Sequence, residues 1–137
     1  MTIKFPTQDW IEALLVEINK SKTYEEAATS WEGDFYFVIE PEGKFEKRVI
    51  LYVDLWHGKC RNATLINDAA ERSPEFTISA PISKWRKVIE KKLDPIQGLV
   101  TRQLILKGNL MKIMKVPKAA LELVNCCTLV PTVFPDI

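Results

Sequence analysis

Residues that could do acid–base chemistry are sparse in this chain. His57 is the single histidine, and it lies beside Gly58 between two expected strands, with no serine or cysteine motif around it. A histidine can act as a general base near neutral pH, but an exposed turn histidine is the favoured interpretation of this pattern. Phosphate-binding glycine loops, nucleophile elbows and HExxH pairs do not occur. The sequence therefore predicts a protein that is not an enzyme and has no cofactor.

The three cysteines match neither a metal site nor a disulfide framework. Cys60 stands alone, while Cys126 and Cys127 are adjacent. Zinc sites use paired ligands at short regular spacings, and disulfide frameworks use an even number of cysteines. Buried, reduced thiols are expected, so the chain is predicted to bind no metal and to reside in a reducing compartment, the cytoplasm.

Composition restricts the partners. With 137 residues the chain is expected to form a single domain over residues 1–137. Hydrophobic residues make up 47% and charged residues 27%, and the formal net charge is +1, which argues against disorder and against a nucleic-acid partner. No apolar run approaches the length of a bilayer span, and the N-terminal residues lack the apolar core of a signal peptide. A soluble intracellular protein is expected.

Helical spacing is clearest near the N-terminus. From residue 7 to residue 20, Trp10, Leu14 and Ile18 recur on one face, which predicts an amphipathic helix. A second short helix is expected over residues 23–31, because Thr23 and Glu26 have the spacing of a capping box. Two of the remaining helices are expected to begin at Pro81 and Pro117. The other two are expected to follow N-caps, one at Asp94 before Pro95 and one at Asn109.

Alternating apolar residues predict five strands, over residues 34–40, 45–56, 60–66, 75–80 and 104–107. Strands followed by helices, with helices at both ends, favour an α+β fold. We expect a five-stranded, mostly antiparallel sheet with helices packed mainly on one face.

The other face of this sheet is also apolar. Tyr36, Val38, Ile50 and Tyr52 would all lie on it, and Ile105 adds to them. A sheet with one wet face alternates more cleanly than this. Two covers are considered: the C-terminal helix, or the same face of a second subunit in a homodimer.

The region around residues 92–115 carries a resemblance to a known family. The matching pieces are Lys92-Leu93-Asp94-Pro95, then residues 104–109 (LILKGN), then residues 110–115 (LMKIMK), with Trp85 in an upstream helix. In this order they resemble the sterol carrier protein type-2 family, a small lipid-transfer domain. Two positions depart from the family pattern, because Ile105 replaces a basic residue and Asn109 replaces an acid.

This resemblance implies an apolar tunnel between the sheet and the helices. The tunnel would hold a lipid with a long apolar chain, namely a fatty acid, a fatty acyl-CoA or a phospholipid, and nothing in the sequence selects a rigid sterol. The function expected is non-catalytic lipid binding and transfer, with the C-terminal helix as a movable lid. The expected ligand-binding residues are Phe35, Phe37, Val49, Leu51, Phe76, Ile78, Trp85, Leu104, Leu106, Leu110, Met114, Leu121 and Val124, with Arg102 or a neighbouring lysine at the mouth.

Two further alternatives stay open. The same fold could serve as a non-lipid interaction or dimerisation module that accompanies an enzyme. The lysines between Lys84 and Lys92, together with Lys112 and Lys115, could be a solvated face balanced by the acids of the chain. They could instead form a basic rim that attracts a lipid headgroup or makes transient contact with an anionic membrane surface.

Overall fold

A computed structural model describes all residues from 1 to 137. Its elements, in chain order, are β1 (Ile3–Lys4), α1 (Gln8–Lys20), α2 (Lys22–Ala27), β2 (Glu32–Glu40), β3 (Val49–Trp56), β4 (Lys59–Ile66), the 3-10 helix η1 (Ala69–Glu71), β5 (Phe76–Pro81), α3 (Ile82–Ile89), α4 (Pro95–Val100), β6 (Ile105–Lys107), α5 (Leu110–Met114), α6 (Pro117–Thr128) and β7 (Thr132–Val133).

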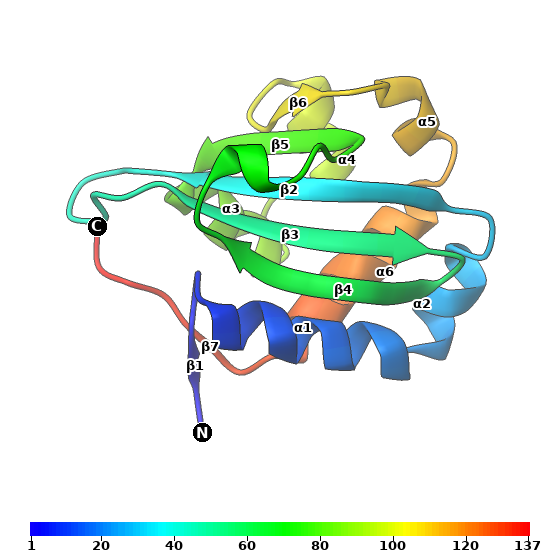
Figure 1. Cartoon of the computed structure of the whole chain (residues 1–137), viewed down its shortest axis with the longest axis horizontal. Coiled ribbons are helices and arrows are strands. Elements are labelled where there is room, and N and C mark those ends of the chain that lie inside the picture. The colour runs from blue at the N-terminus through cyan, green and yellow to red at the C-terminus, as the bar shows by residue number, and fades with distance from the viewer.

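The main sheet has the strand order β4-β3-β2-β5-β6 (Figure 1). Strands β2 and β3 form the expected antiparallel hairpin, in which Phe37 is opposite Leu51. Strand β5 joins the other side of β2 in parallel, and the remaining pairs are antiparallel. The α+β class and the mostly antiparallel five-stranded sheet are therefore confirmed.

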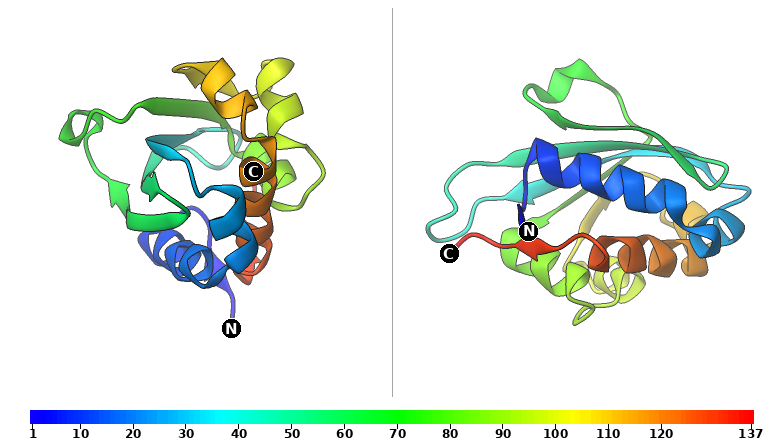
Figure 2. Two further views of the ribbon diagram at one scale, coloured as in Figure 1. Left: turned by 90° about the vertical axis from the view of Figure 1, so that its right-hand side faces the viewer. Right: turned by 90° about the horizontal axis from the view of Figure 1, so that it is seen from below.

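The helices cover one face of this sheet. Seen from below, α1 and α6 run side by side under the strands, and the segment of residues 67–75 lies on the opposite side (Figure 2). Residues Phe35, Ile39 and Leu51 of the strands pack with Ile11 and Ile18 of α1 in one large apolar core. This face of the sheet supplies the floor of the site described below.

Several expected boundaries were wrong. Helix α2 begins at Lys22 and not at Thr23, because the Ser21 hydroxyl accepts the Tyr24 N–H at 3.1 Å and caps the helix. It also ends at Ala27, before the expected residue 31. Strand β3 begins at Val49 and not at Phe45, since Phe45 only closes a tight bridge with Glu42.

The second face of the sheet has a cover that the sequence did not suggest. Residues 67–75 fold across it, in front of the strands in Figure 1, and bury Tyr36, Val38, Tyr52 and Ile66. The Tyr36 hydroxyl lies 3.0 Å from the carbonyl oxygen atoms of Ala69 and Arg72 and accepts the Arg72 N–H at 2.9 Å. The C-terminal helix α6 packs on the helical side, so it is not the cover.

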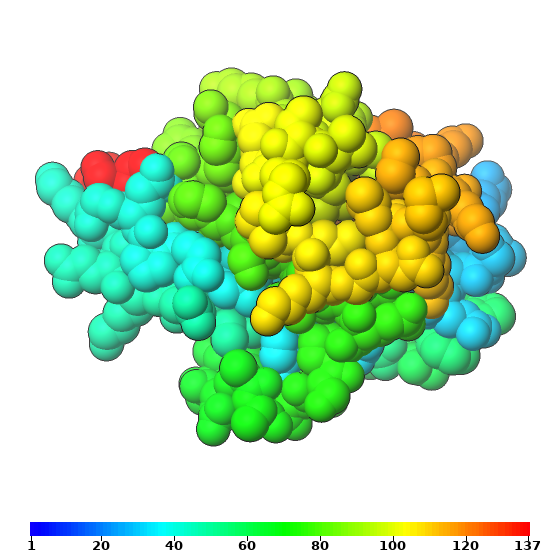
Figure 3. All heavy atoms as spheres, turned by 90° about the horizontal axis from the view of Figure 1, so that it is seen from above, coloured from blue at the N-terminus to red at the C-terminus, as the bar shows by residue number.

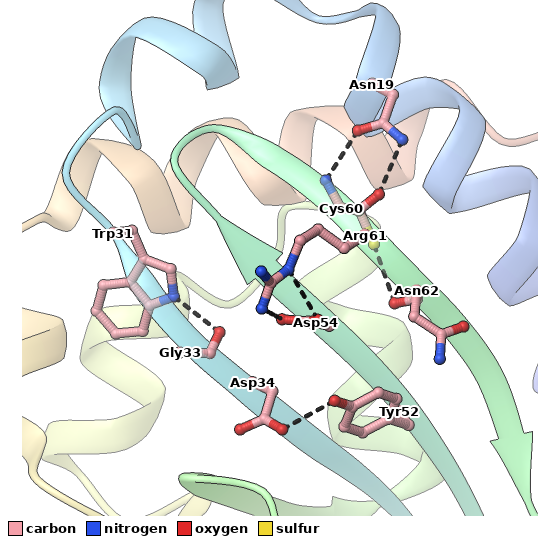
Figure 4. Close-up of polar contacts among 9 residues, drawn as sticks. All are labelled: Asn19, Trp31, Gly33, Asp34, Tyr52, Asp54, Cys60, Arg61 and Asn62. Atoms are coloured by element: carbon pink, nitrogen blue, oxygen red, sulfur yellow. Dashed lines mark hydrogen bonds and ion pairs between the residues drawn. The ribbon is translucent and has the colours of Figure 1, made fainter.

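Helix α1 lies along the free edge of β4. The Asn19 side chain accepts the Cys60 N–H at 2.8 Å and donates to the Cys60 carbonyl at 2.9 Å (Figure 4). At the other end of α1, the Gln8 side-chain oxygen accepts the Leu65 N–H at 2.7 Å. These amides satisfy edge groups that would otherwise be open to pairing with another strand.

The two ends of the chain are joined. Strands β1 and β7 pair in parallel, with Ile3 opposite Thr132, and the Trp10 indole N–H donates to the Thr132 hydroxyl at 2.8 Å. Phe134 then packs edge-on against Phe5, with ring centroids 5.5 Å apart. Helix α6 is consequently held at its C-terminal end as well as along its length.

Candidate functional site

An apolar cavity of about 130 Å³ lies between the sheet and the helices, and 23 of the 24 residues around it are hydrophobic. Its floor comes from β2, β3 and β5, and its walls come from α1 to α6 and their connections. The residues around it are Phe5, Trp10, Leu14, Tyr24, Trp31, Phe35, Phe37, Ile39, Leu51, Leu55, Ile78, Trp85, Val88, Ile89, Pro95, Leu99, Leu104, Ile113, Val116, Ala119, Ala120, Leu123, Val124 and Cys127.

Aromatic rings form one side of the cavity. Phe35 stacks between Trp31 and Phe37, with ring centroids 5.8 and 5.4 Å away. Trp85 meets Phe37 edge-on at 5.5 Å. The Trp31 indole N–H donates to the Gly33 carbonyl at 3.0 Å (Figure 4), and the Trp85 indole N–H donates to the Val38 carbonyl at 3.0 Å. Both donors are satisfied by backbone, so these two indole N–H groups need no partner from a ligand.

The wall of the cavity is electrically neutral. No charged or polar residue is buried in the protein. Burial, followed by the neighbouring Cys126, raises the pKa of the Cys127 thiol to about 12, and burial also raises the pKa of Tyr24. Both groups therefore stay protonated at physiological pH. No group of three or more histidine, cysteine or acidic residues that could hold a metal ion occurs.

Seven of the residues expected from the sequence lie around this cavity. They are Phe35, Phe37, Leu51, Ile78, Trp85, Leu104 and Val124.

The other seven lie elsewhere. Phe76 is fully buried beneath the aromatic cluster, at 5.0 Å from Phe35. Val49, Leu106 and Leu110 are partly buried at the edge of the core. Met114, Leu121 and Arg102 face solvent, and the side chains of Met114 and Leu121 are 39% and 42% exposed.

Helix rotation explains the outward-facing residues. The residues of α6 at the cavity, together with its N-cap residue Val116, recur every three or four positions: Val116, Ala119, Ala120, Leu123, Val124 and Cys127. Leu121 falls on the opposite side of this helix. In α5 the cavity residue is Ile113, so the adjacent Met114 points outward. A helix as apolar as α6 does not reveal from sequence alone which of its faces is buried.

The N-terminal third of the chain also contributes to the cavity, which the sequence patterns did not indicate. Trp10 and Leu14 of α1, Tyr24 of α2 and Trp31 after it all border the cavity. The three-to-four spacing of Trp10 and Leu14 was the available signal, but it was assigned to the core and not to the site.

His57 lies outside the cavity. It occupies the turn between β3 and β4, where its side chain is 51% exposed, as the sequence predicts. Its Nε2 atom is 2.6 Å from a carboxylate oxygen of Glu32. No nucleophile accompanies this pair. No helix of the protein has the length and apolar character needed to cross a membrane.

Comparison with known proteins agrees with this geometry. A crystal structure of sterol carrier protein 2 is 34% identical, with 90% of this chain and 97% of that chain covered and a TM-score of 0.80. A conserved hypothetical protein from Thermus thermophilus is 33% identical, with 93% and 90% covered and a TM-score of 0.84. The same fold forms part of a sec-alkylsulfatase from Pseudomonas sp., at 12% identity, 79% and 15% coverage and a TM-score of 0.53.

No curated protein sequence matches this chain significantly. The model of the SCP-2 sterol transfer family, in contrast, matches residues 2–120, which is most of the chain. Domains of this family bind and transfer lipids without catalysing a reaction. On the strength of this match and of the two similar solved structures, the chain belongs to the SCP-2 sterol transfer family.

Proposed function

We propose that this chain carries one lipid with a long, flexible apolar chain, and that a fatty acid, a fatty acyl-CoA or a phospholipid is its ligand. The observation that carries the proposal is the cavity with 23 hydrophobic residues among its 24. Its walls can shield an acyl chain from water, and they offer no group that would act on it. The lipid would be bound and released without covalent change.

Burial of the acyl chain is the main source of free energy for such binding. About fifteen buried methylene groups gain roughly 12 kcal/mol at about 0.8 kcal/mol each. Association and ordering cost about 4 to 15 kcal/mol. Binding in the micromolar range, about −8 kcal/mol, is therefore reached when the association and ordering cost lies near the low end of that range.

The size of the cavity favours a flexible ligand over a rigid one. Its volume of about 130 Å³ is below that of an ordinary ligand pocket, which is about 300 Å³ or more. An apolar cavity of about 150 Å³ holds no more than one benzene-sized molecule. A larger ligand must displace side chains, and an acyl chain can do so gradually along its length. A fused ring system would require the walls to separate at once, so a sterol is disfavoured.

A cavity-filling substitution tests the proposal. Ala120 borders the cavity on α6, so Ala120→Phe should occupy the space of the acyl chain. Ala70→Phe makes the same change at an exposed position of η1 and serves as the control. Titration with a fluorescent fatty acid should show at least about a tenfold weaker affinity for Ala120→Phe, equivalent to about 1.4 kcal/mol. The control variant should bind the fatty acid as tightly as the parent protein does. Equal affinities would contradict the proposed location of the lipid.

The natural ligand can be identified directly. Native mass spectrometry of the purified protein, followed by solvent extraction, should reveal about one acyl lipid per chain. A protein that stays bare after incubation with fatty acids and acyl-CoA would overturn the proposal.

That outcome would support the alternative, an interaction module without a lipid. The observation in its favour is the same fold within the much longer sec-alkylsulfatase chain. Its other argument, an uncovered apolar sheet face suited to a homodimer, is weakened because residues 67–75 already bury that face. Light scattering on a sizing column distinguishes a monomer from a dimer.

A further inference from the structure

We infer that the face built by α4, β6, α5 and the start of α6 docks on the surface of an anionic lipid bilayer. The first observation is its charge. Residues 95–121 contain Arg102, Lys107, Lys112, Lys115 and Lys118 and no acidic residue, although the whole chain has 18 acids. A net charge of only +1 for the molecule conceals this concentration of positive charge in one segment.

Most of these cations are not neutralised within the protein. Arg102, Lys107, Lys115 and Lys118 are exposed, and none of them forms an ion pair. Only Lys112 is paired, with the Glu75 carboxylate at 2.7 Å. The four unpaired cations are available to anionic headgroups.

The other basic segment differs in two ways. Residues 84–92 carry five cations and one acid, and two of these cations, Arg86 and Lys92, pair with Glu90 at 3.2 and 3.4 Å. None of the large hydrophobic residues in this segment is exposed. Helix α1 is amphipathic, but it carries three acids and a single lysine. An anionic surface would repel α1.

The second observation is apolar exposure on the same segment. Val100, Ile105, Met111, Met114 and Leu121 are between 39% and 62% exposed, and they account for five of the eleven exposed large hydrophobic residues of the chain. In the view onto this face, residues of α4, β6 and α5 form one continuous yellow-to-orange area (Figure 3). Exposed apolar residues set among cations are typical of surfaces that insert shallowly into a bilayer.

The third observation is the position of this face over the cavity. Each of four exposed residues directly adjoins a residue at the cavity: Val100 follows Leu99, Ile105 follows Leu104, Met114 follows Ile113 and Leu121 follows Ala120. The same short stretch of backbone thus separates the cavity from solvent. If this wall rests on a bilayer, an acyl chain can pass between the cavity and the membrane without crossing water.

These features together select a lipid surface over other anionic partners. A nucleic acid would use the cations, but it would leave the exposed methionine, isoleucine and leucine side chains in water. A bilayer uses both, since headgroups attract the cations and the interface accepts apolar side chains. The inference rests on the proposed carrier function for its purpose, but it is tested separately.

The experiment measures binding to vesicles of equal parts phosphatidylcholine and phosphatidylglycerol, and to vesicles of phosphatidylcholine alone. The test variant is K107E/K115E/K118E. The matched control is K22E/K44E/K47E, which makes the same change in net charge at exposed, unpaired lysines elsewhere. Each cation contributes about fivefold near an anionic surface, so the test variant should lose at least about a hundredfold in affinity for the anionic vesicles. The control should lose much less.

A second variant tests the apolar contribution. M111S/M114S changes only exposed side chains, so the fold is retained, and thermal unfolding followed by circular dichroism checks this for every variant. Its affinity for anionic vesicles should be lower than that of the parent at every salt concentration, whereas its salt dependence should be unchanged because the cations remain. An affinity equal to that of the parent would overturn the apolar part of the proposal.

Fatty-acid binding in solution is measured on the same proteins, so that the two proposals fail separately. Undiminished fatty-acid binding by K107E/K115E/K118E, with loss of vesicle binding, would support the docking face. Equal losses for the test and control triple variants would overturn it, and so would absence of binding by the parent protein to anionic vesicles. In both overturning cases, an intact fatty-acid affinity would leave the carrier function standing.

Discussion

Two tryptophans beside the cavity, Trp31 and Trp85, have their polar N–H groups bonded to backbone. The indole N–H groups of Trp31 and Trp85 donate to backbone carbonyls of β2, and no buried side-chain nitrogen or oxygen lacks a partner. An unpaired polar atom in such a cavity would weaken the binding of an apolar ligand, because the polar atom would lose its hydrogen bond to water when the ligand entered. Satisfying these groups locally is what allows large, amphipathic side chains to form an apolar wall.

Gly108 illustrates a backbone constraint at a single residue. Its φ of +136° is strained for any residue with a side chain, and a Cβ atom there would lie 2.6 Å from the ring of Phe76, which is fully buried and cannot move aside. Gly108→Ala should therefore lower the free energy of unfolding by more than about 1 kcal/mol. Urea denaturation measures the change, and an unaltered midpoint would show that the turn after β6 can relax.

Tyr52 couples stability to alkaline pH. Burial first, and then the hydrogen bond that its hydroxyl donates to Asp34 at 2.8 Å, raises its pKa from 10.0 to about 12. The unfolded chain therefore loses this proton at lower pH than the folded protein does. The stability contributed by the protonated phenol is complete below pH 10.0 and is lost as the pH rises toward about 12.

Tyr52→Phe tests this coupling. The variant should be less stable at neutral pH, by about 1.5 to 3 kcal/mol for a hydrogen bond to a charged group. Its stability should then fall less steeply than that of the parent protein above pH 10.0. Urea denaturation midpoints measured from neutral pH to above pH 10.0 give both the loss of stability at neutral pH and the steepness of its fall at alkaline pH. Parallel pH profiles for the two proteins would mean that Tyr52 does not cause the alkaline loss.

For the helices and strands, the sequence predicted most of the starting residues to within a few positions. It predicted less well which face of each helix is buried. The caps at Asp94 and Asn109 and the helix start at Pro117 are confirmed, because each depends on local chemistry that neighbouring residues dictate. The rotation of α6, which turns Ala119 inward and Leu121 outward, depends on contacts with other helices. Strands β1 and β7 were missed because two-residue strands have no pattern of their own.

The cover of the outer sheet face is the clearest case of tertiary structure that sequence patterns could not reveal. Most of this segment, residues 67–74, lies between the expected strands 60–66 and 75–80, is largely polar and carries no hydrophobic periodicity. Their hold on the sheet comes from the Tyr36 hydroxyl and from the Arg72 guanidinium, which stacks 4.4 Å from the Tyr52 ring. Such contacts join residues distant in the chain and leave no local signal.

This cover leads to a prediction about assembly. Replacing residues 67–74 by a glycine–serine stretch of equal length should expose Tyr36, Val38, Tyr52 and Ile66, which are now buried. An exposed apolar sheet face favours association. Light scattering should therefore find a monomer for the parent protein and a dimer or larger species for the variant. A parent protein that is already a dimer, and a variant that becomes a monomer, would show that this loop mediates assembly.

In the molecule as a whole, one part of the cavity wall must move to admit a ligand larger than the cavity. The sequence suggested α6 as the lid because it is terminal and apolar. In the structure α6 buries Ala119, Val124 and Cys126, and the β1–β7 pair and the contact of Phe134 with Phe5 anchor the chain beyond it. The wall formed by residues 95–116 is tied less firmly, because α4 and α5 have six and five residues and β6 pairs over only three.

Hydrogen exchange of the ligand-free protein should therefore be faster in residues 95–116 than in residues 119–130. Helices this short have little stability of their own, and an edge strand of three residues opens more readily than a central one. Addition of palmitate should slow exchange most in residues 95–116, since an occupied cavity stabilises the closed position of this wall. Faster exchange in residues 119–130, with the largest protection there, would return the role of lid to α6. The first result would place the yielding wall on the face that carries the unpaired cations, so that contact with a bilayer and opening of the cavity would involve the same segment.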